Sequence, residues 1–446
     1  MVKKPLQYLL SFSLLAAPLT SFAIDLKGVY QLALENEHQL KADEAAYRAG
    51  IQAKIINRTG IVPNIGASAE YSDINIETGF SNFNTASRSV NYSISLTQAL
   101  FDLNAWYTYK QGLRLTDQAE AQFAADEQAF ILRVANAYFD VLRAADVLEN
   151  SIALEKALKS QLEQTQQRFE VGLTAITDVH NAQADYDSAR AQTLGNRNTL
   201  GSAYDTLEVI TGALQNSVSS LSDNFPVTEP VPNTRQEWVD FALQNNNSLK
   251  AAKLAAEAAR QSSKAAASAI LPTVDATLLA SQDHNFDGDP DIDRDGFTVS
   301  VTLPITNGGG LNAQKRQAHA QYTQTQESYL QTKREVIQSA RSQHLGVLTD
   351  VATVSARKQA IISSESSLEA TQAGYEVGTR DFVDVLNAQQ GVFEAKSNYY
   401  NALYDYIIDT LSLKQTAGTL TPGDILELNN WLDSADEKTR ANYGVD

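Results

Sequence analysis

The stretch that decides the fold is EVGLTAITDVHNAQ at residues 170–183, because it returns as EVGTRDFVDVLNAQ at residues 376–389. A second block repeats closer to the N-terminus, where residues 33–42 share six positions with residues 242–251. Agreement over so many ordered positions indicates an internal duplication. The sequence therefore predicts two copies of one unit, at 24–212 and 233–418, with a linker at 213–232 and a tail at 419–446.

The first 23 residues have the pattern of a secretion signal. Lys3 and Lys4 precede an apolar run at 9–19, and Ser21-Phe22-Ala23 supplies the small residues that a signal peptidase needs. The run is too short to span a bilayer comfortably, and no stop-transfer helix follows it. We expect residues 1–23 to be a cleaved signal peptide, which leaves the periplasm, the outer membrane or the medium as destinations.

The composition argues against catalysis and against nucleic acid as a partner. The chain has 35 basic and 53 acidic residues, and its formal net charge of -18 repels polyanions. Cysteine is absent, which excludes disulfides and zinc–thiolate sites. No nucleophile motif such as Gly-x-Ser-x-Gly is present, so we predict no enzyme, no cofactor and no metal centre. The histidines, which lack ligand spacing, are His38, His180, His284, His319 and His344.

Each unit contains one long helix. In the first unit, apolar residues step by three and four along 102–170, which is the seam of a left-handed coiled coil. At 1.5 Å per residue this helix could be ~100 Å long. We expect the helices 25–61, ended by Pro63, and 175–212 to stack end to end beside it. The seam residues are Ile131, Val134, Tyr138, Val141, Ala145, Leu148 and Ile152, and the second unit repeats the helices at 311–376, 233–270 and 381–417.

Strands are expected between the first short helix and the long helix. Val90, Tyr92, Ile94 and Leu96 alternate with polar residues, as in a strand with one apolar and one polar face. A weaker strand around 67–76 precedes it, and the second unit has two more, so we expect four strands per chain. The strands of the second unit carry Val274, Ala276, Leu278 and Ala280, and Phe297, Val299, Val301 and Leu303.

Such strands can cover a soluble core or form a lipid-facing barrel wall. No other element supplies a core for them, and export makes the lipid-facing alternative reasonable. Trp106, Tyr107 and Tyr109 fit an interfacial aromatic girdle after the second strand. Four strands cannot close a barrel, and an open edge in hydrocarbon leaves backbone groups unsatisfied. Several chains must therefore share one barrel of about eight, twelve or sixteen strands, and the residues do not choose among these numbers.

The repeated segments resemble the TolC family of outer-membrane exit ducts. The resemblance covers essentially all of 24–418. It implies a mixed α and β fold, in which a homotrimer shares a twelve-stranded β-barrel in the outer membrane and continues as a long periplasmic α-helical barrel of coiled coils. It also places the linker 213–232 and the C-terminal segment 419–446 in an equatorial region of that barrel. The segments that carry it are 168–173, 175–179, 375–380 and 383–386, with the strand-to-helix junctions 97–102 and 303–305.

The same resemblance implies the function and the partners. A periplasmic adaptor protein and an inner-membrane transporter of the RND, ABC or MFS type would dock to the trimer. The duct would be the exit of tripartite efflux pumps and type I secretion systems, passing drugs or bile salts, with proteins as a further class of cargo. The residues leave one alternative open, an exported coiled-coil spacer or surface fibre, which has heptads but needs no lipid-facing strands.

Gly172 and Gly378 interrupt the helices at the points farthest along the chain from the strands. We expect them at the turns of two helical hairpins, where glycine tolerates backbone that other residues avoid. By the resemblance, these tips also receive the adaptor. The missing side chain would then let another backbone approach closely.

Asp178 and Asp384 begin the helices that follow these turns, where the helix dipole favours a carboxylate whatever its function. In a closed trimer the two positions would place about six carboxylates around a narrow mouth, a ring that attracts cations. Asn387 stands one turn after Asp384, where the family's pattern has a second acidic residue. The resemblance assigns the gate to Thr177, Asp178, Tyr375, Arg380 and Asp384, with Arg380 and Tyr375 linking neighbouring helix pairs.

The acidic segment 283–296 matches the first half of a calcium loop through Asp291, Asp293 and Asp295. Thr302 stands at the position of the twelfth-residue acid, so a solvated extracellular loop is the favoured interpretation and calcium the alternative. The glycines of 307–310 follow a strand, but no Lys-Ser or Lys-Thr comes after them, so a turn rather than a phosphate loop is predicted.

Overall fold

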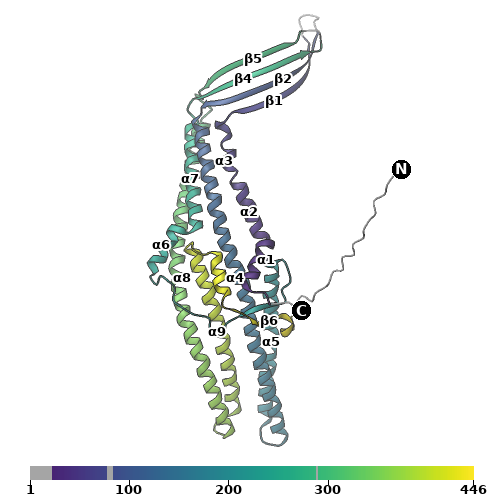
Figure 1. Cartoon of the computed structure of the whole chain (residues 1–446), viewed down its shortest axis with the longest axis vertical. Coiled ribbons are helices and arrows are strands. Elements are labelled where there is room, and N and C mark those ends of the chain that lie inside the picture. Colours follow the sequence, from purple (N-terminus) through teal and green to yellow (C-terminus); the bar gives the residue numbers. More distant parts are fainter. Residues whose placement is uncertain (1–22, 78–83, 288–289, 446) are drawn as a thin grey trace, which may run out of the picture.

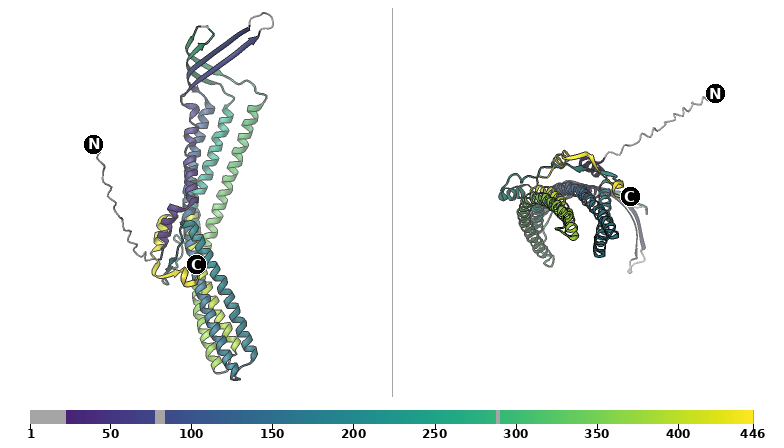
Figure 2. Two further views of the ribbon diagram at one scale, coloured as in Figure 1. Left: turned by 90° about the vertical axis from the view of Figure 1, so that its right-hand side faces the viewer. Right: turned by 90° about the horizontal axis from the view of Figure 1, so that it is seen from below.

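The computed structural model describes residues 23–77, 84–287 and 290–445, so all but the last residue of the expected signal peptide lies outside it. A β-sheet stands at one end of a long helical bundle, and a belt of short elements crosses the bundle near its middle (Figure 1). Seen along the long axis, the helices form an arc and the belt lies on its convex side (Figure 2). Within the described residues, none of the helices combines the length and the apolar character needed to cross a membrane.

The two long helices lie where the heptads predict them. α4 (Leu103–Glu170) has 68 residues and α8 (Gly310–Glu376) has 67. Each is therefore about 100 Å long at 1.5 Å per residue. The chain returns as α5 (Ile176–Thr211) after α4 and as α9 (Phe382–Thr416) after α8. The predicted long helices are confirmed to within a few residues at each end.

The predicted seam of α4 is buried. Val134, Tyr138, Val141, Ala145 and Leu148 have no exposed surface. α4 contacts α5 of its own unit and α9 of the second unit, together with α7 (Asn247–Ser268). The seam thus joins the two units as well as holding one hairpin together.

The continuous helix predicted over 25–61 is wrong, because the segment is broken. Glu37 ends the first piece with an extended backbone, at ψ 119°. Its buried carboxylate accepts hydrogen bonds from the Arg133 guanidinium at 2.6 and 2.9 Å. This contact with α4 holds the break. The pieces are α1 (Leu26–Asn36), α2 (His38–Gly50), α3 (Ala53–Ile56) and the 3-10 turn η1 (Thr59–Ile61).

The second unit is broken at the equivalent position. α6 (Arg235–Asn245) ends before Asn246, which the repeat matches with Glu37, and α7 follows it. The Asn246 side chain caps α7 by accepting a hydrogen bond from the Leu249 N–H at 2.8 Å. The same bend is therefore made by two different polar side chains.

The four expected strands form one antiparallel sheet in the order β1-β2-β4-β5. The sheet leaves β1 and β5 as its edges, and no other described element pairs with them. A turn at residues 303–309 leads from β5 into α8, and η1 leads from the short helices to β1. The strands are β1 (Asn64–Glu77), β2 (Asn84–Phe101), β4 (Thr273–Asn285) and β5 (Ile292–Thr302).

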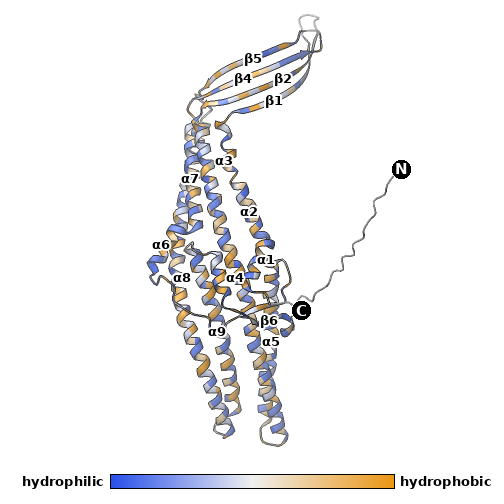
Figure 3. Cartoon of the chain, in the orientation of Figure 1, coloured by the Kyte–Doolittle hydropathy of each residue, from blue (hydrophilic) through white to orange (hydrophobic). Residues whose placement is uncertain are grey.

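Toward the helices, the register sorts the side chains into an apolar and a polar face, and Asp293 and Asp295 interrupt the apolar face farther along β5. Leu96 lies opposite Ile65 and Leu278, and Leu278 lies opposite Phe297, so one row crosses all four strands. The next row, which points to the other side, contains Thr97, Thr277 and Thr298. Hydropathy alternates along the strands accordingly (Figure 3).

The belt lies where the linker and the C-terminal segment were expected to form an equatorial region, but its strands and their pairing were not predicted. β3 (Ser217–Leu221) pairs with β6 (Leu432–Thr439), although more than two hundred residues separate them. α10 (Pro422–Asn429) and the 3-10 turn η2 (Arg440–Tyr443) complete the belt. Its main core lies between these elements and the helices, and includes Leu26, Tyr138, Tyr204, Tyr404 and Ile425.

A buried ion pair ties the belt to α4. The Lys438 ammonium of β6 lies 3.2 Å from Asp146 and 2.8 Å from Glu149. The Tyr404 hydroxyl donates a hydrogen bond to Asp146 at 2.6 Å. Burial raises the pKa of the Asp146 carboxyl, and the Lys438 charge opposes that rise. Loss of Lys438 would leave a buried carboxylate without its cation, which costs about 3–5 kcal/mol.

Candidate functional site

The two hairpin turns lie together at the end of the bundle farthest from the sheet (Figure 1). Gly172 has φ 76° and Gly378 has φ 75°, a left-handed conformation that side chains other than glycine's rarely adopt. The turn at Gly172 is closed by the Leu173 N–H, which donates to the Arg168 carbonyl at 2.8 Å. Nothing lies within 4 Å of a Cβ placed on either glycine. Both turns therefore need glycine for their backbone and leave open space in front of it.

A side-chain contact joins the two hairpins near these turns. Arg168, in the last turn of α4, donates a hydrogen bond to the Tyr375 hydroxyl of α8 at 2.8 Å. Its guanidinium also lies 5.0 Å from the centre of the Tyr375 ring. The Tyr375 ring in turn lies 6.0 Å from the Phe382 ring at the start of α9. Tyr375 thus links one helix pair to the other within this chain.

Arg380 makes its contact inside its own hairpin. Its guanidinium lies 3.6 Å from the Asp384 carboxylate, one helical turn away. Asp384 also belongs to a capping box, since its N–H donates to the Asp381 side chain at 2.9 Å. The side chains of Arg380 and Asp384 are 60% and 39% exposed, so solvent screens their attraction. The predicted role of Arg380 between neighbouring helix pairs stays a prediction.

The counterpart in the first hairpin is Asp178. Its carboxylate accepts a hydrogen bond from the Thr174 hydroxyl and a long one, at 3.4 Å, from the Ala175 N–H. Thr177 and Asn387 are exposed on their helices. Each chain therefore presents two carboxylates, Asp178 and Asp384, at the N-termini of α5 and α9. This placement favours negative charge and can attract cations.

Sequence reasoning did not assign site roles to Arg168 or Asp381. Arg168 belongs to the segment 168–173, which carries the family resemblance, and is the basic residue in the last turn of α4, a position that favours a cation in any helix. Because this preference explains the residue without any partner, nothing in the sequence pointed to its contact with Tyr375. Asp381 was detectable as a helix N-cap three residues before Asp384, but caps are common and carry no functional signal.

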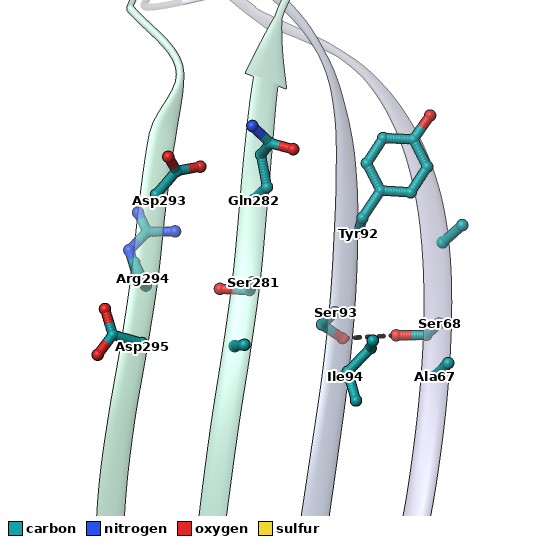
Figure 4. A pocket seen from close by; sticks show the side chains of 12 residues that line it. Ala67, Ser68, Tyr92, Ser93, Ile94, Ser281, Gln282, Asp293, Arg294 and Asp295 are labelled. Atoms are coloured by element: carbon teal, nitrogen blue, oxygen red, sulfur yellow. Dashed lines mark hydrogen bonds between the residues drawn. The ribbon is translucent and has the colours of Figure 1, made fainter.

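The sheet is a second candidate surface, because no described element of the chain covers its apolar face. Ile65, Ile94, Phe297 and Val301 are 60–69% exposed. A groove of about 800 Å³ follows the sheet across Ser68, Tyr92 and Gln282 (Figure 4). Ser68 and Ser93 share a hydrogen bond at 2.8 Å on the polar side. These strands bury no core within the described chain.

The acidic segment after β4 does not have the shape of a calcium loop. Asp293 and Asp295 lie in β5, where the extended backbone cannot wrap around an ion. Asp291 lies 2.8 Å from the His284 ring nitrogen, and Asp283 accepts a hydrogen bond from Arg294. The hydrogen bond from His284 and, more weakly, the Asn285 N–H lower the pKa of Asp291. The solvated loop remains the better interpretation.

Three comparisons with known proteins agree. A sequence model of the family described as "Outer membrane efflux protein" matches residues 29–213 and 238–419. Outer membrane protein TolC of Escherichia coli (strain K12) is 34% identical over 445 residues, covering 97% of this chain and 90% of the relative. Alkaline protease secretion protein AprF of Pseudomonas aeruginosa is 26% identical, covering 91% of this chain and 86% of the relative.

Among solved structures, the Campylobacter jejuni CmeC outer membrane channel superposes with a TM-score of 0.79 at 17% identity. The match covers 92% of this chain and 90% of that one. The outer membrane protein VceC of Vibrio cholerae gives a TM-score of 0.76 at 19% identity, over 88% of this chain and 96% of the other. At these identities the likeness concerns the fold.

Proposed function

This chain belongs to the outer membrane efflux protein family and is an outer-membrane exit duct of efflux pumps and secretion systems, and we propose that three copies close into one tube. In the tube, twelve strands form the barrel in the outer membrane and the helices line the periplasmic part. Solutes pass along the axis without chemical change.

The observation that carries the proposal is the open, uncovered sheet. Within the part of the chain that the structure describes, β1 and β5 each have a free edge. Unsatisfied backbone groups in hydrocarbon cost several kcal/mol, of order 2–7 each. Pairing β5 of one copy with β1 of the next satisfies both edges. The apolar face then meets lipid, and the polar face, with Ser68 and Ser93, lines the lumen.

The internal repeat supports the same closure in the helices. α7 lies between α4 and α8, and one of its rows, Ala251, Ala258 and Ala265, is 2–6% exposed. The Ala265 carbonyl accepts a hydrogen bond from Asn104 of α4 at 2.8 Å. The repeat matches this row with Ala42, Ala49 and Ile56, which are exposed on α2 and α3.

The row on α7 is covered by α4, whereas no described helix of the chain covers the equivalent row on α2 and α3. Within the chain, α4 follows β2, α7 precedes β4, and β2 pairs with β4. By the same relation, α8 follows β5 and would pack on the α2–α3 row of the next copy, whose β1 pairs with β5. The α8 edge and the α2–α3 edge then meet all around the tube.

At the periplasmic end we propose a gate formed by Thr177, Asp178, Tyr375, Arg380 and Asp384, with Arg168 as the partner of Tyr375. The contact between Arg168 and Tyr375 supports this, because it joins two helix pairs that must separate if the mouth widens. A periplasmic adaptor and an inner-membrane transporter of the RND, ABC or MFS type would supply the energy.

The tube is tested by purifying the protein from outer membranes. We expect an oligomer that requires detergent, dissociates only on heating, and forms channels in planar bilayers. A soluble rod without conductance would support the alternative, a coiled-coil spacer or surface fibre. Cross-linking the oligomer and counting its bands gives the number of subunits.

We propose the tips around Gly172 and Gly378 as the adaptor-docking surface. Because the space in front of Gly378 is open, Gly378→Arg should leave an assembled channel but abolish efflux. Drug susceptibility of cells with normal channel levels measures this. Gly378→Ala, which imposes the same backbone strain at φ 75° without the bulk, is the matched control and should pump normally. Normal efflux in Gly378→Arg would exclude the tips as the docking site.

A further inference from the structure

A basic patch interrupts the acidic surface at the level of the belt. Arg235 of α6 and Arg334, Ile337, Arg341 and Leu345 of α8 line a groove of about 510 Å³. The four α8 residues lie on one helix face, since they are spaced by three or four. Within the described chain, none of the three arginines forms an ion pair. This is an unpaired concentration of positive charge in a chain of net charge -18.

The opposite edge of the chain carries an acidic patch with an apolar centre. Leu34 is 44% exposed and Val209 is 79% exposed, and Glu35 and Glu208 stand beside them. α1 contacts α5, so the two helices that carry these residues lie side by side at this edge. Neither glutamate has an ion-pair partner among the described residues.

The two patches stand at the same level. Ile337 lies about 40 Å below the start of α8, and Leu34 lies about 40 Å below Ile61 if the short helices rise 1.5 Å per residue. Leu345 and Val209 both lie about 50 Å below the sheet by the same measure. α6 and α1 accordingly occupy similar heights on opposite sides of the chain (Figure 1).

We propose that the basic patch of one copy docks on the acidic patch of the next copy, with Ile337 near Leu34 and Leu345 near Val209. Arg334 and Arg341 would then face Glu35 and Glu208 across the contact. This inference rests on the proposed tube and names the contact that fixes the height of one subunit against the next. The charges exclude a copy shifted along the axis, because a shift leaves both patches unpaired.

Disulfide trapping tests the contact, since the chain has no cysteine of its own. The variant with Leu345→Cys and Val209→Cys should form disulfides between copies on oxidation, at least tenfold more than either single variant. The matched control replaces Val209→Cys by Leu194→Cys, which is 55% exposed on the same helix about 20 Å lower, and should not cross-link. A normal oligomer without cross-links in the Leu345–Val209 variant would overturn the contact and leave the tube standing.

Charge reversal tests the same contact independently. Arg334→Glu with Arg341→Glu should lower the oligomer yield at least tenfold, and adding Glu35→Arg with Glu208→Arg should restore it. Arg357→Glu, on an exposed part of α8 outside the patch, is the control and should assemble. Full assembly of the first variant with loss of efflux would overturn the proposal in favour of an acidic partner protein. If the unmodified chain forms no oligomer, the tube itself fails.

Discussion

At the scale of single residues, the tips combine one contact between hairpins with two carboxylates. Arg168 and Tyr375 belong to different hairpins, whereas Arg380 and Asp384 belong to the same one. A contact between hairpins resists opening, while a contact within a hairpin moves with it. Arg168 should therefore contribute more to the closed mouth than its place in an ordinary helix end suggests.

Removing the Arg168 side chain should loosen the mouth. We expect Arg168→Ala to raise single-channel conductance in planar bilayers severalfold, because the Tyr375 hydroxyl loses its donor. A hydrogen bond to a charged group is worth about 1.5–3 kcal/mol, enough to shift the open population about tenfold or more. Lys159→Ala removes one positive charge from the exposed side of α4 and is the control. Equal conductance in both variants would contradict the link.

Asn387 should set how strongly multivalent cations block the channel. Asn387→Asp adds about three carboxylates to the mouth of a trimer, and repulsion between them makes each added cation bind more tightly. We expect the variant to be blocked at lower concentrations of a trivalent cation, measured as the half-blocking concentration in planar bilayers. Asn196→Asp, placed higher on α5, should not change it. An unchanged value in Asn387→Asp would show that this position does not face the mouth.

At the scale of elements, an acidic contact joins α8 and α9. Asp350 of α8 and Asp409 of α9 lie side by side, and Asp405 adds a further negative charge. Arg143 of α4 lies 2.8 Å from Asp405 and partly offsets the repulsion. Burial first, and then the Asp409 charge, raise the pKa of Asp350 to about 6. Between about pH 4 and pH 6, the folded protein therefore holds a proton here that the unfolded chain releases.

This pair predicts a pH dependence of stability. Because the folded pKa of Asp350 is above its unfolded value, its contribution to the free energy of unfolding falls as pH rises from about 4 to about 6. Asp350→Asn should remove that fall and raise stability at pH 8 by roughly 1 kcal/mol, after allowance for solvent screening. Denaturant unfolding of the two proteins at pH 4.5 and 8, values spanning roughly that window, measures it. If the free energy of unfolding of the two proteins changed with pH in parallel, the folded protein would hold no extra proton at Asp350.

At the scale of the whole molecule, the two faces of the sheet should differ in what they tolerate. Ile94 and Val299 lie on the apolar face and are 60% and 49% exposed, whereas Ser93 and Ser300 lie on the polar face. The tube places the first pair against lipid and the second pair against water. The chain alone would expose both pairs alike.

Arginine on the apolar face should block assembly. Ile94→Arg or Val299→Arg should cost about 2–4 kcal/mol near the bilayer midplane, whereas Ser93→Arg and Ser300→Arg should be milder. The measurement is the yield of heat-modifiable oligomer in outer membranes. Equal oligomer yields for the two pairs of variants would contradict the assignment of the apolar face to lipid in a β-barrel.

The parts of the fold whose burial follows a local period could be predicted from the sequence alone. The seam of α4 and the alternation of β2 are visible because a helix or strand that buries one face repeats its apolar residues every 3.6 or 2 positions. Gly172 and Gly378 were predicted at turns because each interrupts a helical pattern at the point farthest along the chain from the strands. The position of Asp384 was predictable in the same way, because the N-terminus of a helix favours a carboxylate.

The contacts between distant segments became visible only in the folded structure. The break at Glu37 depends on its contact with Arg133, and the belt joins β3 to β6. Lys438 contacts Asp146, which lies far earlier in the chain. The contact of Arg168 with Tyr375 is of the same kind. Such pairs leave no periodic pattern in the sequence. The two partners are far apart along the chain, and only folding brings their charges and hydrogen-bonding groups together.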